Sequence, residues 1–323
     1  MQLKTLNDVA ATDMECVNEL IKDQTVSDAR LICEVGNHVI NNGGKRLRSL
    51  IVILVARALG YHGHDHIIVA ALIELLHSAS LMHDDVVDEA RYRRGRISAN
   101  VIYGNKSCIR VGNYFCTRAF RMMVNLPEKR IASLMTEAAN TVTEGEILQL
   151  ANLLNINTTP DDYFNIIYSK TGKLFEVASQ SAAVTAQASP EKEESLKEFG
   201  NHLGTAFQLV DDALDYAGDK KNTGKNTGQD WTEGKITLPL IHALNNTTTK
   251  RAEFIKEALN IPSRSQYLKE VLRIITETGS LDYTYQQAEK EIVKALSGLK
   301  CLPLSPFRTT LEEIAYASLA REF

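Results

Sequence analysis

The sequence has few of the residues that interrupt helices. Proline occurs 7 times and glycine 18 times in 323 residues, and so few breakers favour long helices over many short strands. No purely apolar run exceeds the seven residues of 50–56 and 67–73, whereas a membrane span needs about 18. We therefore expect no transmembrane segment. The 44% hydrophobic and 24% charged residues exclude a disordered chain and indicate a globular protein.

A basic excess and a cysteine pattern are also missing. The formal net charge is −4, so the chain has no general positive field that would bind nucleic acid. The 5 cysteines are scattered without a CxxC pair, which argues against a disulfide framework or a zinc knuckle, and we interpret them as small buried side chains. Asp8, Asp13 and Glu15 lie where a secretory signal would be cationic and then apolar. We predict a cytoplasmic protein.

Helical periodicity dominates the chain. Apolar residues recur at helical spacing from 131 to 148, which predicts one long amphipathic helix. Three further helices are predicted to begin where a hydroxyl residue precedes a proline, at Thr159-Pro160, Ser189-Pro190 and Ser305-Pro306. A hydroxyl caps the first turn, and proline fits the first helical position because it needs no amide partner there.

Strands and domain boundaries are not indicated. No segment alternates convincingly between apolar and polar residues, and the polar stretch 220–234, which we predict to be the main loop, brings no change in composition. The histidine-rich segment 62–66 lies between Gly60 and the next predicted helix, and we interpret it as a surface turn. We expect one all-α domain over 1–323, a bundle of ten or more helices.

The strongest chemical signal is a duplicated acidic motif. DDVVD at 84–88 and DDALD at 211–215 both follow an apolar helical pattern, and residues four apart on a helix share a face. Like charges at that spacing repel unless a cation neutralises them. Mg²⁺ takes oxygen ligands and bridges carboxylates to substrate phosphates. One such motif alone is more often a solvated helix end, but two copies favour a metal site, and neither has the spacing of an EF-hand.

Cationic side chains lie near both motifs. GGKRLR at 43–48 precedes a fully apolar run, which predicts an anion site at a helix N-terminus; an exposed basic turn is the plain alternative, and the spacing is not that of a Walker loop. Arg93 and Arg94 follow the first acidic motif, and Lys225 and Lys235 follow the second. We expect these cations to face a phosphorylated substrate.

Several other residues carry weaker signals. His77 lies two helical turns before Asp84 and is able to donate to a phosphate oxygen, although a lone helical histidine is more often a core residue. Lys170-Thr171 and Gln208 belong to two other predicted helices and matter only if those helices line the same cavity. The arginine-rich run 91–96 is typical of a nucleic-acid patch, but the acids before it and the negative net charge argue against that function.

Taken together, these segments resemble the trans-polyprenyl diphosphate synthases. The segments that carry the resemblance are GGKRLR at 43–48, LHSASLMHDDVVD at 76–88, KTG at 170–172, FQLVDD at 207–212 and GK at 234–235. The resemblance extends from 41 to 240, and the stretch 84–123 is most similar to the bacterial octaprenyl diphosphate synthases. It implies an all-α fold of the isoprenoid synthase type around a central cavity, a homodimer and dependence on Mg²⁺.

The resemblance also implies a role for each motif residue. Isopentenyl diphosphate would be bound by Lys45, Arg48, His77 and Arg94. Several Mg²⁺ ions on the allylic diphosphate would be held by Asp84, Asp85, Asp88, Asp211, Asp212 and Asp215. The allylic diphosphate would be contacted by Arg93, Lys170, Lys225 and Lys235, and the developing cation by Thr171 and Gln208. The residues expected to be catalytic are Asp84, Asp88, Asp211, Lys170 and Lys225.

The expected reaction needs no side-chain nucleophile. Metal ions and lysines would stabilise the departing diphosphate, so that the allylic C1–O bond breaks toward a carbocation that isopentenyl diphosphate attacks. The expected wall of the product channel consists of Ile73, Leu76, Ala79 and Ser80. Because the last two are small, we expect a long product. We predict octaprenyl diphosphate, made from farnesyl diphosphate for quinone side chains, with peripheral membrane contact during its release.

Other functions stay open on the sequence. A shorter-chain synthase would share every motif. A terpene cyclase would carry an Asn/Ser/Glu metal motif in place of 211–215, and a regulatory subunit of a heteromeric synthase would have lost aspartates or cations. A simple Mg²⁺ or phosphate-binding module leaves the apolar helices behind the aspartates unexplained. Two positions depart from the family pattern, Ser49, where many relatives have proline, and Asn113, where aspartate is common.

Overall fold

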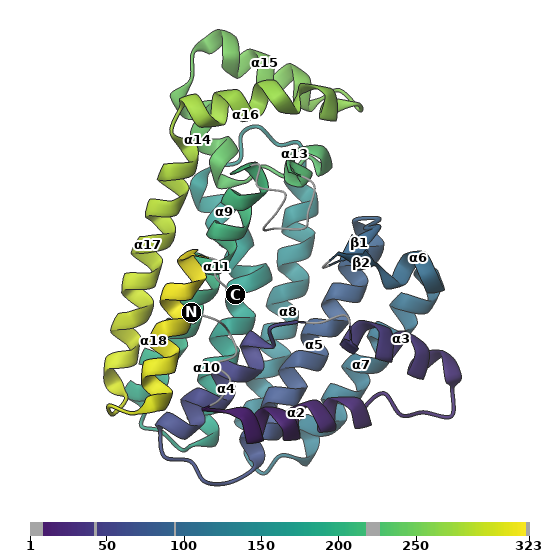
Figure 1. Ribbon diagram of the computed structural model, residues 1–323, viewed down its shortest axis with the longest axis vertical. Coiled ribbons are helices and arrows are strands. Elements are labelled where there is room, and N and C mark those ends of the chain that lie inside the picture. The colour runs from purple at the N-terminus through teal and green to yellow at the C-terminus, as the bar shows by residue number, and fades with distance from the viewer. Residues whose placement is uncertain (1–8, 42–43, 94, 218–226, 321–323) are drawn as a thin grey trace.

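The computed structural model describes residues 9–41, 44–93, 95–217 and 227–320, and nearly all of it is helical (Figure 1). The first helices are α2 (Ala11–Asp23), α3 (Arg30–Asn41), α4 (Leu47–Ala58), α5 (Asp65–Val87), α6 (Ala99–Tyr103), α7 (Asn105–Asn125) and α8 (Arg130–Ala151). They are followed by α9 (Pro160–Ile167), α10 (Lys173–Thr185), α11 (Pro190–Ala217), α13 (Gln229–Glu233), α14 (Leu238–Asn246), α15 (Thr249–Leu259), α16 (Leu268–Glu277), α17 (Ser280–Gly298) and α18 (Pro306–Ala320). A π-helical turn, η1 (Tyr168–Gly172), joins α9 to α10, and the 3₁₀ turns are η2 (Arg264–Tyr267) and η3 (Leu299–Cys301).

These helices confirm the all-α prediction and exceed ten in number. The long amphipathic helix expected at 131–148 is α8, and α9, α11 and α18 each begin at the proline of a predicted start. At α9 the cap is reciprocal. The Asp162 amide donates to Oγ1 of Thr159 at 3.1 Å, and the Thr159 amide donates to the Asp162 carboxylate at 3.0 Å. This arrangement satisfies amides that helix geometry leaves unpaired.

Two short elements differ from the prediction. The strands β1 (Tyr92–Arg93) and β2 (Arg96–Ile97) form an antiparallel pair after α5, and they are too short to give an alternating sequence pattern. The prediction of a loop over 220–234 is wrong in part, because that stretch contains α13. The part of that stretch up to residue 226 lies outside the described residues.

Burial corrects two interpretations. The segment 62–66 is a surface turn only in part, since its last residue, His66, is fully buried in α5 with Nε2 3.0 Å from Asp13. The interpretation of the cysteines as buried is correct for Cys108 only. Cys16 is exposed and the other three are half-buried, and all five are free thiols.

The core lies around α4 and α10. Every residue of α10 is buried, and α4 is buried over its whole length except at Arg48 and Arg57. Helix α10 packs against α4, α8 and α11, and α5 packs against α4 and α7. In Figure 1, α17 and α18 cover one flank of this core, while α15 and α16 lie at one end of the molecule. The helices that carry the motifs therefore meet at the core.

Helix α5 is long and apolar enough to cross a membrane by length and composition, with a mean hydropathy of 1.4 over its most apolar window. However, 67% of that window is buried inside the fold. A core helix passes the same test, so α5 is only weak evidence for a membrane span. Its burial reflects packing against α4 and α7.

Candidate functional site

The first acidic motif closes α5. Asp84 and Asp85 lie in its last turn, and Asp88 is its C-cap residue. Arg93 of β1 reaches back to the motif, and its Nε donates to Oδ1 of the buried Asp85 at 2.6 Å. Burial raises the pKa of Asp84 to about 7, and the carboxylates of Glu146 and Asp88 add to this effect. The charged form of Asp84 is therefore disfavoured mainly by the loss of water around it, while Lys170 and Arg93 oppose the shift.

The second acidic motif lies near the end of α11. Asp212 is buried and accepts hydrogen bonds from the Tyr163 hydroxyl of α9 at 2.6 Å and from Nε2 of Gln208 at 2.7 Å. Burial raises the pKa of Asp212 to about 7, and the adjacent Asp211 contributes to the rise. The Asp212 carboxylate is thus held in a fixed direction by two neighbouring side chains.

Asp215, the last residue of this motif, holds the start of α13. Its carboxylate accepts the backbone amides of Gln229 and Asp230 at 3.1 and 3.0 Å. Burial raises the pKa of Asp230 well above its usual range, and the carboxylates of Asp212 and Asp215 add to the shift. Asp230 therefore extends the acidic cluster of α11 into α13.

Lys235 joins the two acidic clusters. Its Nζ lies 3.2 Å from Oδ2 of Asp88 and 2.6 Å from Oε2 of Glu233, and its backbone amide donates to the Asp230 carbonyl at 2.8 Å. Burial opposes the charge of Lys235, but its pKa is raised because the surrounding carboxylates outweigh burial. Because Lys235 follows the second acidic motif in the sequence, a partner in that motif would be expected. In the structure its ammonium group pairs instead with Asp88 of the first motif.

The position of Lys235 depends on the glycine before it. Gly234 has a φ of +81°, and a Cβ at this residue would lie 2.5 Å from Cδ2 of Leu154. The Gly234 carbonyl accepts the Leu154 amide at 2.9 Å, which ties the segment after α13 to the loop after α8. A larger residue would be strained and would clash here. This explains the Gly-Lys pair in physical terms.

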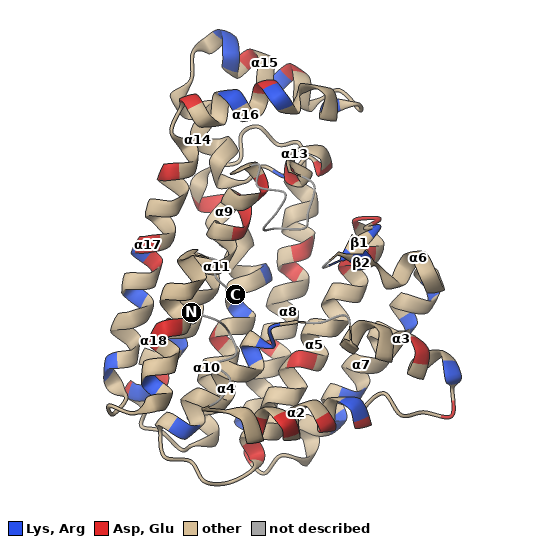
Figure 2. Cartoon of the chain, viewed as in Figure 1, with Lys and Arg blue, Asp and Glu red and all other residues tan. Residues whose placement is uncertain are grey.

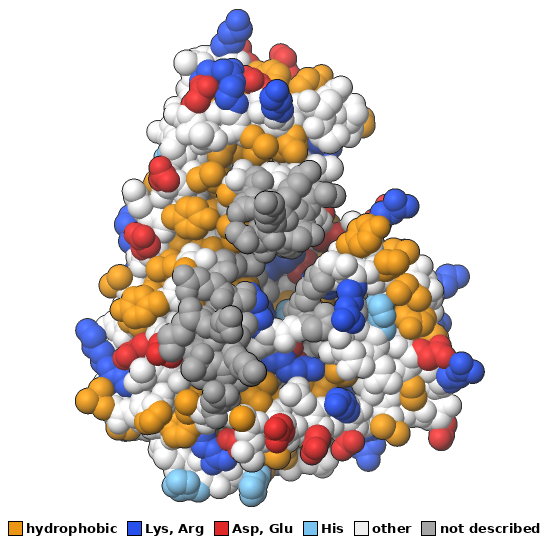
Figure 3. Space-filling view, in the orientation of Figure 1, with side chains coloured by type: hydrophobic (Ala, Val, Ile, Leu, Met, Phe, Trp, Pro, Cys, Tyr) orange, Lys and Arg blue, Asp and Glu red, His pale blue; other side chains and the backbone are white. Residues whose placement is uncertain are grey.

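Charged side chains gather around a hollow in the surface. Figure 3 shows the hollow beside the β1–β2 hairpin, with acidic and basic side chains at its base, and Figure 2 shows acidic residues on α8, α9 and α13. A narrow cavity is lined by residues of the basic segment, α5 and the hairpin, including Gly44, Arg46, Glu74, His77, Asp85 and Arg93. The fold thus brings the predicted anion-binding segment to the first acidic motif.

Lys170, Thr171 and Gln208 also come together. Lys170 and Thr171 belong to η1, and Oγ1 of Thr171 donates to Oε1 of Gln208 at 2.8 Å. Because Gln208 in turn donates to Asp212, it connects η1 to the second acidic motif. Nζ of Lys170 lies 2.7 Å from Oε2 of Glu146 on α8. These residues, weak as separate signals, lie together beside the second acidic motif.

The predicted binding group for isopentenyl diphosphate is assembled in part. Nη1 of Arg48 on α4 lies 3.2 Å from Nε2 of His77 on α5. The Arg48 guanidinium also lies over the Phe175 ring of α10, 4.5 Å from its centroid, an arrangement that stabilises the cation. Lys45 is half-buried just before α4. These three cationic or basic side chains come from two helices and the segment that precedes one of them.

The remaining predicted residues are two cations, the channel wall and the two departures from the family pattern. Arg94 and Lys225 lie outside the described residues. On α5, the predicted channel wall is buried at Ile73, Leu76 and Ala79 and half-buried at Ser80. Of the departures from the family pattern, Asn113 is exposed, and Ser49 is buried and donates to Oε2 of Glu74 at 3.2 Å. The channel wall stays a prediction.

Several polar residues around the predicted ones were not predicted, among them Glu146, Tyr163 and Asp230. Glu146 and Tyr163 lie at ordinary positions of amphipathic helices, and no spacing in the sequence distinguishes them from surface or core residues. Asp230 precedes the Gly-Lys pair, which is a weak signal. Nothing local in the sequence indicates that α13 folds against α11, and that contact is what places Asp230 at the site.

The acidic cluster fits a hard divalent cation. Within the described ranges, no three carboxylate, histidine or cysteine side chains are grouped closely enough to hold a metal ion as they stand. The ligands offered are nevertheless carboxylate oxygens, which Mg²⁺ prefers. The raised pKa values of Asp84 and Asp212 reflect chiefly burial, with neighbouring carboxylates adding to it, and a bound cation would favour the charged form of both groups. The assignment of the six aspartates as metal ligands stays a prediction.

Known proteins are similar to this chain over nearly its whole length. Residues 29–276 match the family model described as polyprenyl synthetase. Octaprenyl diphosphate synthase of Escherichia coli is 44% identical over 322 residues, which cover 100% of each chain. The crystal structure of a decaprenyl diphosphate synthase from Rhodobacter capsulatus has a TM-score of 0.93, with 37% identity and 99% of each chain covered. A polyprenyl synthase from Caulobacter crescentus, complexed with calcium and isoprenyl diphosphate, has a TM-score of 0.94, with 36% identity over 100% of this chain and 98% of that one.

Proposed function

Because the chain belongs to the polyprenyl synthetase family, we propose that it is a prenyltransferase that condenses isopentenyl diphosphate onto an allylic diphosphate, with farnesyl diphosphate as the primer. Its similarity to an octaprenyl diphosphate synthase over the full length supports octaprenyl diphosphate as the product. Quinone side chains are the destination that we propose for this product. The observation that carries the proposal is the meeting of two acidic motifs, from α5 and α11, through Lys235 and α13.

Mg²⁺ is the cofactor that we propose. The ligands would be the aspartates of both motifs, Asp84, Asp85, Asp88, Asp211, Asp212 and Asp215. The relative from Caulobacter crescentus binds calcium together with an isoprenyl diphosphate, which supports a divalent cation beside the same kind of substrate. When bound, Mg²⁺ supplies charge neutralisation that makes diphosphate a better leaving group.

The chain's own cations bind the two diphosphates in this proposal. Arg93, Lys170 and Lys235 lie next to the acidic motifs and contact the allylic diphosphate. Lys225, which lies outside the described residues, is proposed to bind the same diphosphate. Isopentenyl diphosphate is bound by Lys45, Arg48, His77 and Arg94. The contacts of Arg48 with His77 and Phe175 support this assignment, because they hold its guanidinium in one orientation.

The allylic C1–O bond then breaks, and positive charge develops on the substrate. Thr171 and Gln208, hydrogen-bonded to each other, present oxygen dipoles toward this charge. The double bond of isopentenyl diphosphate attacks the cation, and the released diphosphate takes the final proton. The apolar walls of α4, α5 and α10 exclude water, which would otherwise capture the cation. No protein nucleophile takes part.

A homodimer is the oligomeric state that we propose. Helix α7 leaves Ile109, Phe120 and Val124 exposed, and their spacing places them on one face of the helix. Such a stripe is typical of a surface covered by a partner, and a second copy of the chain would cover it. Five free thiols support a cytoplasmic location, with peripheral membrane contact only when the apolar product leaves.

Incubation of the purified protein with Mg²⁺, farnesyl diphosphate and labelled isopentenyl diphosphate tests the function. We expect a long labelled prenyl chain, with octaprenyl diphosphate as its main component. Asp84→Asn and Asp211→Asn should abolish the product, whereas Asp161→Asn, which changes an exposed carboxylate of α9, should not. A cyclic hydrocarbon would indicate a terpene cyclase, and no product from the folded protein would favour a regulatory subunit. A shorter chain would contradict the octaprenyl assignment alone.

A further inference from the structure

The π-helical turn η1 is the structural feature that presents Lys170 and Thr171 to the site. A π-helical turn has one more residue per hydrogen-bonded ring than an α-helix, is rare, and frequently occurs at functional sites. It persists only where surrounding contacts fix it. Those contacts are therefore part of the machinery that positions Lys170 and Thr171.

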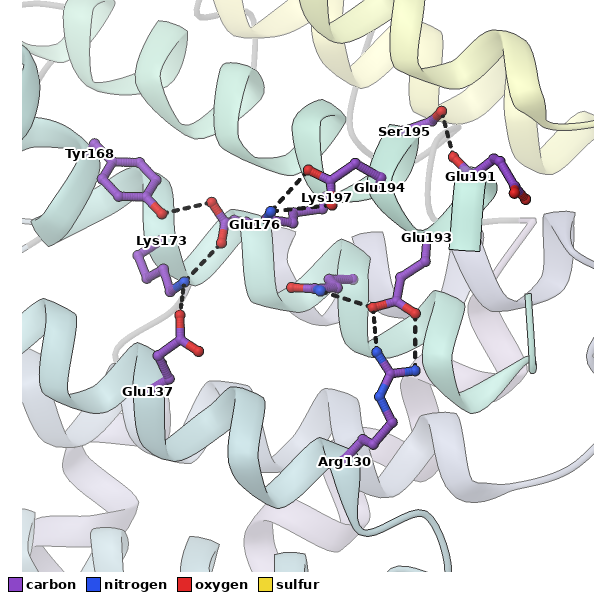
Figure 4. A network of polar contacts seen from close by, with 11 residues as sticks. Arg130, Glu137, Tyr168, Lys173, Glu176, Glu191, Glu193, Glu194, Ser195 and Lys197 are labelled. Carbon is purple, nitrogen blue, oxygen red and sulfur yellow. Dashed lines mark hydrogen bonds and ion pairs between the residues drawn. The ribbon is translucent and has the colours of Figure 1, made fainter. Parts of the chain in front are cut away.

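A buried carboxylate holds both ends of η1 (Figure 4). Oε2 of Glu176 accepts the hydroxyl of Tyr168, the first residue of η1, at 2.8 Å. Oε1 accepts Nζ of Lys173, the residue that follows η1, at 2.8 Å. Lys173 also contacts Glu137 of α8 at 2.9 Å. Both oxygens of one side chain are thus used to bracket the turn.

The charges in this bracket lie in an apolar environment. Glu176 and Lys173 are 2% and 7% exposed, and all of α10 is buried. Burial alone would lower the pKa of Lys173, but Glu176 and Glu137 raise it, and burial together with Glu176 raises the pKa of Tyr168 to about 12. The lysine stays charged and the tyrosine stays protonated at neutral pH. A buried ion pair contributes little net stability compared with apolar residues, so its value here is geometric.

Helices α8 and α11 pack against η1 and restrict the path of its backbone. On α8, Gly145 packs against the turn, and a Cβ there would lie 2.6 Å from Cβ of Ser169 and 3.0 Å from the Lys170 amide nitrogen. On α11, Gln208 accepts the hydroxyl of Thr171. The turn is therefore packed between α8 and α11 and bracketed from α10.

We infer that Glu176 is a positioning residue that fixes η1, so that Lys170 and Thr171 face the allylic half of the site. This inference rests on the proposed function, because the roles of Lys170 and Thr171 are themselves proposed. Glu176 does not touch substrate in this scheme. Its effect passes through the backbone of η1 and is therefore confined to the allylic diphosphate.

Glu176→Gln is the test, because it keeps the shape of the side chain and removes its charge. Glu193→Gln is the matched control. Glu193 is also a buried glutamate, and it pairs with Arg130 at 2.8 Å and with Gln180 of α10 at 2.9 Å, apart from η1 in Figure 4.

For Glu176→Gln, we expect kcat to fall by about 10- to 100-fold, as for a small misplacement of binding groups, and KM for the allylic diphosphate to rise. KM for isopentenyl diphosphate should stay within about twofold of the wild type. Glu193→Gln should leave both KM values unchanged. If Glu176→Gln changed the KM values of both substrates equally, Glu176 would be merely structural and the inference would be overturned. The same holds if Glu193→Gln raised KM for the allylic diphosphate as much as Glu176→Gln does.

Amide hydrogen exchange of a peptide covering 168–172 gives a second readout that does not depend on activity. Exchange should be faster in Glu176→Gln than in Glu193→Gln, and equal exchange would overturn the inference. If the wild-type protein condenses no substrate, the proposed function fails, and exchange alone decides whether Glu176 fixes η1. If Glu176→Gln does not fold, Tyr168→Phe removes one of the two bonds and is judged by the same criteria.

Discussion

The hydrogen bond from Tyr163 to Asp212 offers a sharp test of the second acidic motif. Both side chains are buried, and the hydroxyl lies 2.6 Å from the carboxylate. A hydrogen bond to a charged group contributes about 1.5–3 kcal/mol. Since about 1.4 kcal/mol corresponds to tenfold in an equilibrium constant, Tyr163→Phe should weaken Mg²⁺ binding by about 10- to 100-fold. Residues that orient metal ligands have effects of this size.

The measurement is the Mg²⁺ concentration that gives half-maximal condensation of labelled isopentenyl diphosphate with farnesyl diphosphate. We expect this concentration to rise by about 10- to 100-fold in Tyr163→Phe, with much of the rate recovered at high Mg²⁺. Tyr216→Phe is the control, because Tyr216 is buried on the same helix as Asp212 and no hydrogen bond joins its hydroxyl to an aspartate within the described residues. An unchanged Mg²⁺ requirement in a folded Tyr163→Phe protein would refute the view that Tyr163 orients a metal ligand.

Three other perturbations have defined outcomes. Ala79→Phe should shorten the product while the first condensations continue, and an unaltered chain-length profile on chromatography would contradict the channel wall. Lys235→Gln should lower kcat on the order of 100-fold, because it removes the ammonium group beside Asp88. Lys235→Arg should retain more activity, and equal kcat values of the two variants would exclude a charge effect. His66 is buried beside Asp13, and burial lowers the pKa of His66. The unfolded chain therefore binds more protons than the folded one, and the stability of the fold should decrease as the pH falls from about 7 to 5. Urea unfolding of His66→Gln should show a weaker pH dependence over that window, and an identical dependence would exclude this histidine as the cause.

The sequence predicted the helices and the chemical types of the site residues for local reasons. Proline after a hydroxyl marks a helix start because capping and the fixed φ of proline act within one turn, and α9, α11 and α18 begin where these signals lie. Acidic residues four apart are recognisable on any helix. Burial of single residues was predicted less well, as His66 and the cysteines show, because it depends on which helix packs over them.

The sequence by itself determined an all-α chain with two acidic motifs, and it identified the family through residues that lie in short segments. Only the tertiary structure decided that Lys235 pairs with Asp88, that Asp230 joins the second motif and that Glu176 brackets η1. These contacts join residues on different elements, or residues on either side of an irregular turn. Their distances depend on how the helices pack, and local propensity carries no information about that packing.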